Sequence, residues 1–210
     1  MVMGELLRLI ASDGVELEAE QTVAEHEQAR MVLCHPHPLH GGTMRSLVIS
    51  ELFAALPALG ISCVRFNFRS VGESGGSHDD GDAERLDVLA TVEAFNDESS
   101  PLVILGWSFG ADVTLSIDGP NAAGWIAIAP PLRYGTDFTS VGADLRPKLV
   151  ILAAHDEFRP AAEVAAITAS WRATTTETVA GASHFFVGRT DRLIDLTATW
   201  TRREVLRNRQ

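Results

Sequence analysis

The stretch PLVILGWSFGADVTLSI, from Pro101 to Ile117, decides the fold. Its first part, Leu102 to Leu105, is an unbroken apolar run rich in β-branched residues, which is typical of a buried strand. From Phe109 onward the residues favour a helix. The two parts meet in a G-x-S-x-G motif, residues 106–110, whose sharp turn exposes the hydroxyl of its central residue. The stretch therefore predicts a nucleophilic serine at Ser108.

Predicted strands and helices alternate along the rest of the chain. Alternating apolar and polar residues around Asp13-Gly14 predict an N-terminal antiparallel hairpin over residues 5–24. After it, we expect strands at 29–34, 61–68, 102–105, 125–129, 148–153 and 176–179, and helices at 46–59, 82–95, from 109, at 161–171 and at 191–206. This order predicts an α/β fold with a mainly parallel sheet and helices on both faces, which binds ligands at the carboxyl ends of its strands.

Length and charge narrow the class of protein. A chain of 210 residues suits one domain over residues 1–210, and a formal net charge of −11 argues against nucleic acid and anionic membranes as partners. No apolar run approaches the ~20 residues of a membrane span, and charges at Glu5 and Arg8 argue against a signal peptide. We therefore expect a cytoplasmic protein with Cys34 and Cys63 reduced. The sequence does not distinguish a monomer from a homo-oligomer.

A serine hydroxyl needs a general base and a group that orients the base. His184, just beyond the last predicted strand, is the candidate base, and Asp156, just beyond the strand before it, is the candidate acid. Serine, acid and histidine follow one another in an order known for such triads. Glu157 is the rival acid, and either carboxylate has the alternative role of a charge at the start of a helix. The alternative for His184 is a solvated loop residue.

The tetrahedral intermediate of acyl transfer needs two N–H donors that face its oxyanion. One is the backbone N–H of Phe109, the residue after the nucleophile. The second is expected from the HPHPLHGG loop at 35–42, where the prolines lack N–H groups and stiffen the backbone around His37. We therefore predict that the backbone N–H groups of His37 and Phe109 form the oxyanion hole.

The histidines of this loop, His35, His37 and His40, also suggest a metal site. The motif contains no carboxylate or cysteine partner, and Pro38 interrupts regular geometry, so we predict no metal and no other cofactor. The alternative for His35 is a structural histidine that binds backbone groups around the site.

Apolar side chains next to the candidate catalytic residues predict an acyl pocket. The substrate-pocket residues that we expect are Trp107, Phe185 and Leu39, with Phe109 and Phe186 as further aromatic neighbours. The alternative for these aromatic residues is an ordinary place in the core.

The chain resembles the small, cap-less α/β-hydrolases of bacteria, which are distantly related to dienelactone hydrolases. The resemblance spans nearly the whole chain and rests on HPHPLHGGTM at 35–44, RFNFRSVGESGG at 65–76, GWSFGA at 106–111, DEFRP at 156–160 and GASHFFVGR at 181–189. It implies an α/β-hydrolase fold, a triad of Ser108, Asp156 and His184, and an oxyanion role for His37. Dienelactone hydrolases have cysteine at the elbow, so Ser108 favours ordinary ester chemistry. The link at 132–147 is too short for the lid domain of many relatives.

From these observations we expect a serine hydrolase that cleaves small carboxylic esters through an acyl-enzyme. A thioesterase, an acyltransferase or a peptidase would use the same triad, and only substrates separate them. A non-catalytic binding protein with this fold is the alternative from another class. The sequence identifies neither the physiological substrate nor whether the glycine-rich segment 72–81 gates the site.

Overall fold

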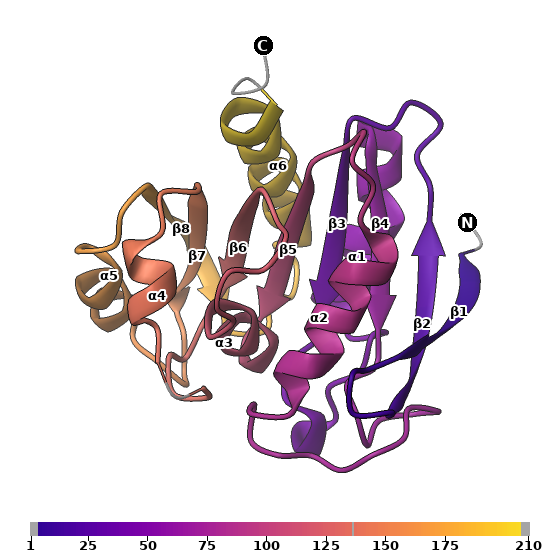
Figure 1. Ribbon diagram of the computed structural model, residues 1–210. Helices are drawn as coiled ribbons and strands as arrows, with labels where there is room; N and C mark the ends of the chain where they lie inside the picture. The colour runs from indigo at the N-terminus through magenta and orange to yellow at the C-terminus, as the bar shows by residue number, and fades with distance from the viewer. Residues whose placement is uncertain (1–3, 136, 207–210) are drawn as a thin grey trace.

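The computed structural model describes residues 4–135 and 137–206, which form an eight-stranded sheet in the order β1-β2-β4-β3-β5-β6-β7-β8 (Figure 1). The strands are β1 (Glu5–Ile10), β2 (Glu16–Thr22), β3 (Ala29–Cys34), β4 (Ile61–Phe66), β5 (Leu102–Trp107), β6 (Gly124–Ile128), β7 (Lys148–His155) and β8 (Thr174–Ser183). β2 is antiparallel to both β1 and β4. The strands β4, β3, β5, β6, β7 and β8, which are neighbours in that order, pair in parallel. The predicted mainly parallel sheet with an N-terminal hairpin is confirmed.

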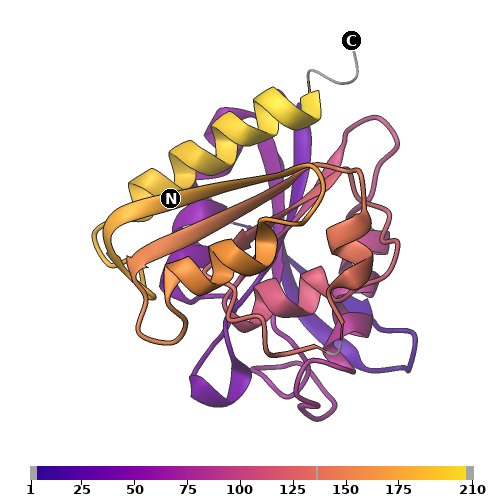
Figure 2. The same ribbon diagram turned by 90° about the vertical axis from the view of Figure 1, so that its left-hand side faces the viewer.

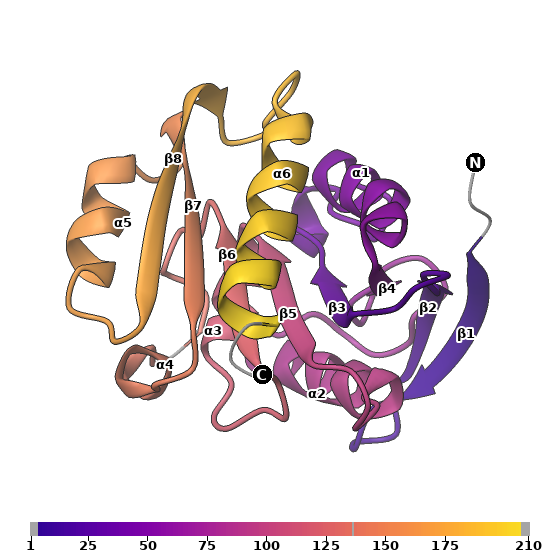
Figure 3. The same cartoon turned by 90° about the horizontal axis from the view of Figure 1, so that it is seen from above.

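Helices cover both faces of this sheet, as expected. They are α1 (Leu47–Ala55), α2 (Glu84–Phe95), α3 (Phe109–Leu115), α4 (Thr139–Ala143), α5 (Ala161–Thr168) and α6 (Thr190–Trp200). α1 and α6 lie on one face, and α2 and α3 lie on the other (Figure 3). In Figure 2 the yellow α6 and the orange α5 lie on opposite sides of β7 and β8.

The central strand β5 shows why the strands here are continuous apolar runs. Successive side chains of a strand point to opposite faces. Val103 and Leu105 therefore pack in the core beneath α1 and α6, whereas Leu102 and Ile104 pack in the core beneath α2 and α3. All four are at most 2% exposed. Burial on both faces requires apolar residues at every position, so the run shows no alternation.

Some predicted elements differ from the observed ones. The helix predicted over 46–59 is α-helical only to Ala55 and continues as a 3₁₀ turn (Leu56–Leu59), because Pro57 has no N–H for the next α-helical bond. Likewise α6 is followed by a π-helical segment (Thr201–Leu206). β8 is longer than predicted because much of it is exposed and polar. The link expected to be irregular contains α4, whose five residues are too few for a periodic signal; residue 136 of this link lies outside the described residues.

The candidate site residues lie at one edge of the sheet. Because β3 to β8 are all parallel, their carboxyl ends meet at the same edge, where the following loops carry the candidate site residues. Cys34 and Cys63 are free, buried thiols. Among the described helices, none combines the length and apolar character that crossing a bilayer requires.

Candidate active site

Ser108 occupies a strained turn between β5 and α3. Its backbone has φ 56° and ψ −120°, a conformation that side-chain-bearing residues rarely adopt and that is concentrated at functional sites. The N–H of Ser108 donates to the carbonyl of Ile128 at 2.8 Å, and the carbonyl of Ser108 accepts the N–H of Ala111 at 2.9 Å. The sheet and the helix thus hold the turn from both sides.

Two glycines allow the close contacts that this turn requires. A Cβ atom on Gly106 would lie 2.3 Å from the carbonyl of Gly110. A Cβ atom on Gly110 would lie 2.5 Å from the carbonyl oxygens of Cys34 and His35. Any larger residue would therefore push α3 away from β5 and β3, and Ser108 would move with it.

The structure brings Ser108, His184 and Asp156 together from three strand ends. Nε2 of His184 lies 2.8 Å from Oγ of Ser108, and Nδ1 of His184 lies 2.8 Å from Oδ2 of Asp156. Both the imidazole and the carboxylate are only 5% exposed. With Asp156 ionised, the proton of a neutral imidazole belongs on Nδ1, which leaves the Nε2 lone pair facing the serine hydroxyl.

The environment of Asp156 favours its charged form. Burial by itself would raise the pKa of this carboxyl, but hydrogen bonds from His184 and from the N–H groups of Arg159 and Phe158 outweigh burial and lower the pKa. The rival acid Glu157 is placed differently: its Oε2 accepts the backbone N–H of His184 at 3.0 Å. Glu157 thus holds the backbone of the loop, whereas Asp156 contacts the ring.

The two residues predicted to supply the oxyanion donors are in contact through their side chains. The rings of His37 and Phe109 are 4.9 Å apart, although His37 comes from the loop after β3 and Phe109 is the first residue of α3. Within the described residues, neither backbone N–H is hydrogen-bonded to another group. The carbonyl of His37 accepts the N–H of Gly42 at 3.0 Å, which closes its loop into a tight turn.

His35 has the structural role that the sequence analysis gave as the alternative to metal binding. It is completely buried, its Nε2 accepts the N–H of Phe68 at 3.0 Å, and its Nδ1 lies 2.6 Å from the carbonyl of Pro36. Burial lowers the pKa of His35 to about 4, so the ring is neutral. Because both ring nitrogens are used by the backbone, His35 is not available to join His37 and His40 in a metal site.

A cavity of about 570 Å³ opens beside Ser108 and His184. Of the predicted pocket residues, Trp107 and Phe185 line it, but Leu39 does not. Leu39 lies in an exposed 3₁₀ turn (Pro38–His40) and is itself 69% exposed. Phe186 is fully buried in the core. Lining residues that the sequence did not indicate include Leu47, at the start of α1, and Arg133, Tyr134, Phe158 and Val187, which lie in loops that lack a periodic pattern.

Asp112 fixes one wall of this cavity. It is fully buried in α3, one turn after Ser108, and its carboxylate accepts the N–H groups of Leu132, Arg133 and Tyr134 at 2.9, 2.7 and 2.9 Å. Arg133 and Tyr134 line the cavity. Burial outweighs these hydrogen bonds and raises the pKa of Asp112 to about 7. An acidic residue inside an apolar helix was the signal for this role in the sequence.

We expect the Asp112→Asn variant to differ from the wild type in the pH dependence of stability. Since the pKa of Asp112 is raised from 3.8 to about 7 on folding, the folded state holds this proton more tightly. The contribution of Asp112 to the free energy of unfolding should therefore fall by roughly 2 to 3 kcal/mol between about pH 5 and pH 8. Urea unfolding of both proteins measures the difference, and parallel stability curves would contradict this assignment.

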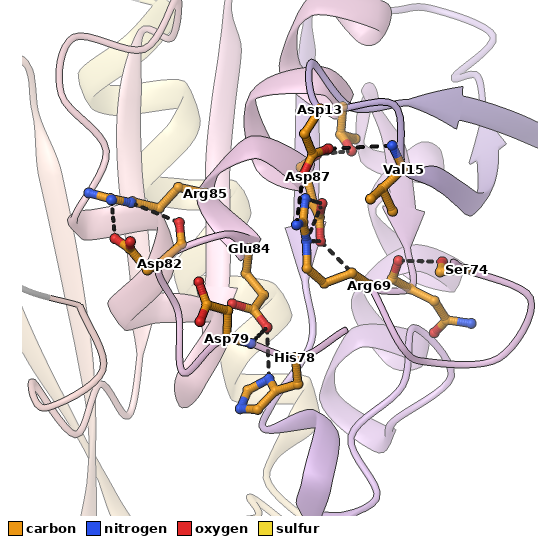
Figure 4. A network of polar contacts seen from close by, with 12 residues as sticks. Asp13, Val15, Arg69, Ser74, His78, Asp79, Asp82, Glu84, Arg85 and Asp87 are labelled. Carbon is orange, nitrogen blue, oxygen red and sulfur yellow. Dashed lines mark hydrogen bonds and ion pairs between the residues drawn. The ribbon is translucent and has the colours of Figure 1, made fainter. Parts of the chain in front are cut away.

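The segment that precedes α2 is anchored at both ends (Figure 4). At its start, the guanidinium of Arg69 bonds to Asp87 at 2.7 Å and to Asp13 at 2.8 Å. At its end, the fully buried Glu84 accepts the N–H groups of Asp79 and Gly81 at 3.0 and 2.9 Å. These contacts tie the ends of the glycine-rich segment 72–81 to the body of the protein.

Comparison with known proteins places the chain among hydrolases. The model of the alpha/beta hydrolase family matches residues 31–206. An α/β serine hydrolase homologue from Coxiella burnetii shares 31% sequence identity and a TM-score of 0.82, with 99% of this chain and 98% of that chain covered. An α/β serine hydrolase without lid from Xanthomonas campestris shares 31% identity and a TM-score of 0.83, with 98% and 96% covered.

A more distant structure agrees in fold, and a further relative is similar in sequence. An esterase from Pyrococcus furiosus has a TM-score of 0.81 at 16% identity, with 96% of this chain and 93% of that chain covered. An uncharacterized protein of Rickettsia prowazekii (strain Madrid E) is 30% identical over 140 residues, which span 63% of this chain and 59% of that protein. Since the family model covers most of the chain and two similar structures cover nearly all of it, the chain belongs to the alpha/beta hydrolase family.

Proposed function

We propose that this chain is a serine hydrolase that cleaves small carboxylic esters through an acyl-enzyme. Ser108 is the nucleophile, His184 the general base and Asp156 the orienting acid. The observation that carries the proposal is the pair of 2.8 Å contacts that connects the three side chains in this order. The family, and the description of two similar structures as serine hydrolases, support it.

In the proposed mechanism, Oγ of Ser108 attacks the ester carbonyl while Nε2 of His184 takes the hydroxyl proton. The new C–O bond produces a tetrahedral intermediate, whose oxyanion accepts the N–H groups of Phe109 and His37. The bond to the alcohol then breaks, and the alcohol leaves with the proton from His184. Water attacks the acyl group on Ser108 by the same route, releases the acid and restores the serine.

The cavity supports the choice of a small ester. Its volume of about 570 Å³ lies in the range of small-molecule sites, and the rings of Trp107 and Phe185 provide apolar surface beside the reacting groups. Arg133 and Tyr134 add polar groups to the wall. The link between β6 and β7 holds only the short α4 within its described residues, so this link adds no lid domain that would shield a long acyl chain from water.

A panel of p-nitrophenyl esters tests the substrate class. We expect kcat/KM to be higher for acetyl and butyryl esters than for octanoyl and longer esters, because the short link between β6 and β7 leaves additional methylene groups unshielded from water. Thioesters with the same acyl groups serve as the comparison. Much faster turnover of octanoyl or longer esters would contradict the small-substrate proposal, and a preference for thioesters by more than about tenfold would favour the thioesterase alternative.

A further inference from the structure

A second group of side chains with metal-binding chemistry lies beside the cavity. His37, His78 and Asp80 each offer one ligand atom, and these atoms all lie within 4.8 Å of one another. His37 comes from the loop after β3, and the other two come from the segment between β4 and α2. Two imidazole nitrogens and a carboxylate oxygen form a donor set that suits Zn²⁺. The sequence did not predict this group because its members are brought together only by the fold.

His78 lies against a buried carboxylate. Its Nδ1 lies 2.7 Å from Oε1 of Glu84, in a geometry that forms no hydrogen bond, and the two side chains are 9% and 0% exposed (Figure 4). Glu84 is itself fixed because it accepts the N–H groups of Asp79 and Gly81. The negative charge of Glu84 favours a positive charge at His78, which a bound metal ion would supply.

The outer nitrogen of His78 has a negatively charged neighbour. Nε2 lies 3.2 Å from Oδ1 of Asp80, which accepts an N–H from Nε2 in one tautomer of His78; with the proton on Nδ1 instead, both atoms can bind a cation. The side chain of Asp80 is 87% exposed, and in the described chain it has no ion pair with a lysine or an arginine. Its exposure also leaves the carboxylate free to turn toward a cation.

His37 completes the donor set with one of its ring nitrogens. Its ring centre lies 5.0 Å from that of His78. The Nδ1 of His37 accepts one exposed hydrogen bond, from the N–H of Leu39 at 3.2 Å. Rotation of the ring toward a metal ion gives up this hydrogen bond and part of the ring contacts with His40, Phe109 and Tyr134.

We propose that His37, His78 and Asp80 form a Zn²⁺ site at the wall of the cavity. The inhibitory role of this site rests on the proposed function, whereas the binding does not. His37 lines the cavity, and its backbone N–H is a proposed oxyanion donor. An ion bound between His37 and His78 would hold the His37 side chain away from its present position, strain the backbone that carries this donor and narrow the cavity beside Ser108. Since small displacements of catalytic groups cost up to about 10²-fold in rate, zinc should inhibit the hydrolase.

Calorimetric titration of the chelator-treated protein with ZnCl₂ near neutral pH tests the site. We expect one ion per chain, with affinity reduced at least about tenfold in Asp80→Asn and in His78→Phe. Asparagine tolerates the positive φ of 47° at position 80, and phenylalanine keeps the ring packing of His78 against Phe109, so both variants should fold. The control is His26→Ala, an exposed histidine near the amino end of β4.

Two outcomes would overturn the site: no saturable zinc binding by the wild type, or equal affinity in the wild type and both site variants. Ester hydrolysis with and without zinc then tests the inhibition, which should be present in the wild type and in His26→Ala and weakened in Asp80→Asn. Zinc binding without inhibition would overturn the regulatory role, but the zinc-binding site itself would stand. Failure of the hydrolase proposal would show instead as absent ester turnover in a protein that still binds zinc through these residues.

Discussion

Replacing Ser108 with alanine should lower kcat/KM for a small ester by roughly 10⁴-fold to 10⁶-fold and leave the fold intact. The hydroxyl that is removed is the atom that would form the acyl bond, and no neighbouring side chain can replace it. The loss to stability should be small, because in the described chain Oγ of Ser108 bonds only to His184. Hydrolysis of p-nitrophenyl butyrate and labelling by a fluorophosphonate probe both measure the effect.

The matched control is His184→Ala, which keeps the hydroxyl but removes the base 2.8 Å from it. Labelling that is lost in both variants, at unchanged melting temperature, would establish an activated Ser108. Labelling that persists in Ser108→Ala would move the nucleophile to another residue. A folded wild-type protein that reacts with neither the probe nor any ester would contradict the enzyme proposal and favour the binding-protein alternative.

The parts of the site that could be predicted from sequence all lie next to the strands. Ser108, Asp156 and His184 each follow a predicted strand, and parallel strands bring their carboxyl ends to one edge. The fold class followed from the alternation of strands and helices for the same reason. Local patterns were sufficient because each residue's place in the fold depends on its own strand.

The parts that could not be predicted depend on contacts between distant loops. Leu39 was expected in the pocket, yet the turn that carries it is exposed. Asp112 reaches backbone groups about twenty residues further along the chain, and the carboxylate of Glu84, at the start of α2, lies 2.7 Å from Nδ1 of His78. The positions of Arg133 and Tyr134 on the cavity wall follow from Asp112 rather than from their own sequence. Such loop positions carry no periodic signal.

Asp156→Asn should lower kcat by about 10⁴-fold, whereas Glu157→Gln should lower it by less than about tenfold. The pKa of Asp156 is held below 3.8, so its carboxylate is charged at neutral pH and accepts the Nδ1–H of His184. An asparagine amide has a carbonyl oxygen that accepts hydrogen bonds and an NH₂ group that only donates them. With its NH₂ group toward Nδ1, it would favour the opposite tautomer, in which Nε2 carries the proton and accepts none from Ser108.

Glu157→Gln is the matched comparison, because the two acidic residues are neighbours and only one contacts the ring. The Glu157 carboxylate accepts the backbone N–H of His184 at 3.0 Å, and a glutamine carbonyl can accept the same bond. Initial rates near neutral pH, with melting temperatures for both variants, measure the difference. Equal losses in the two variants would mean that the loop's position, rather than the charge on Asp156, limits the rate. A larger loss in Glu157→Gln would exchange the two roles. The contact at 2.8 Å between Asp156 and Nδ1 of His184 argues for the larger loss in Asp156→Asn.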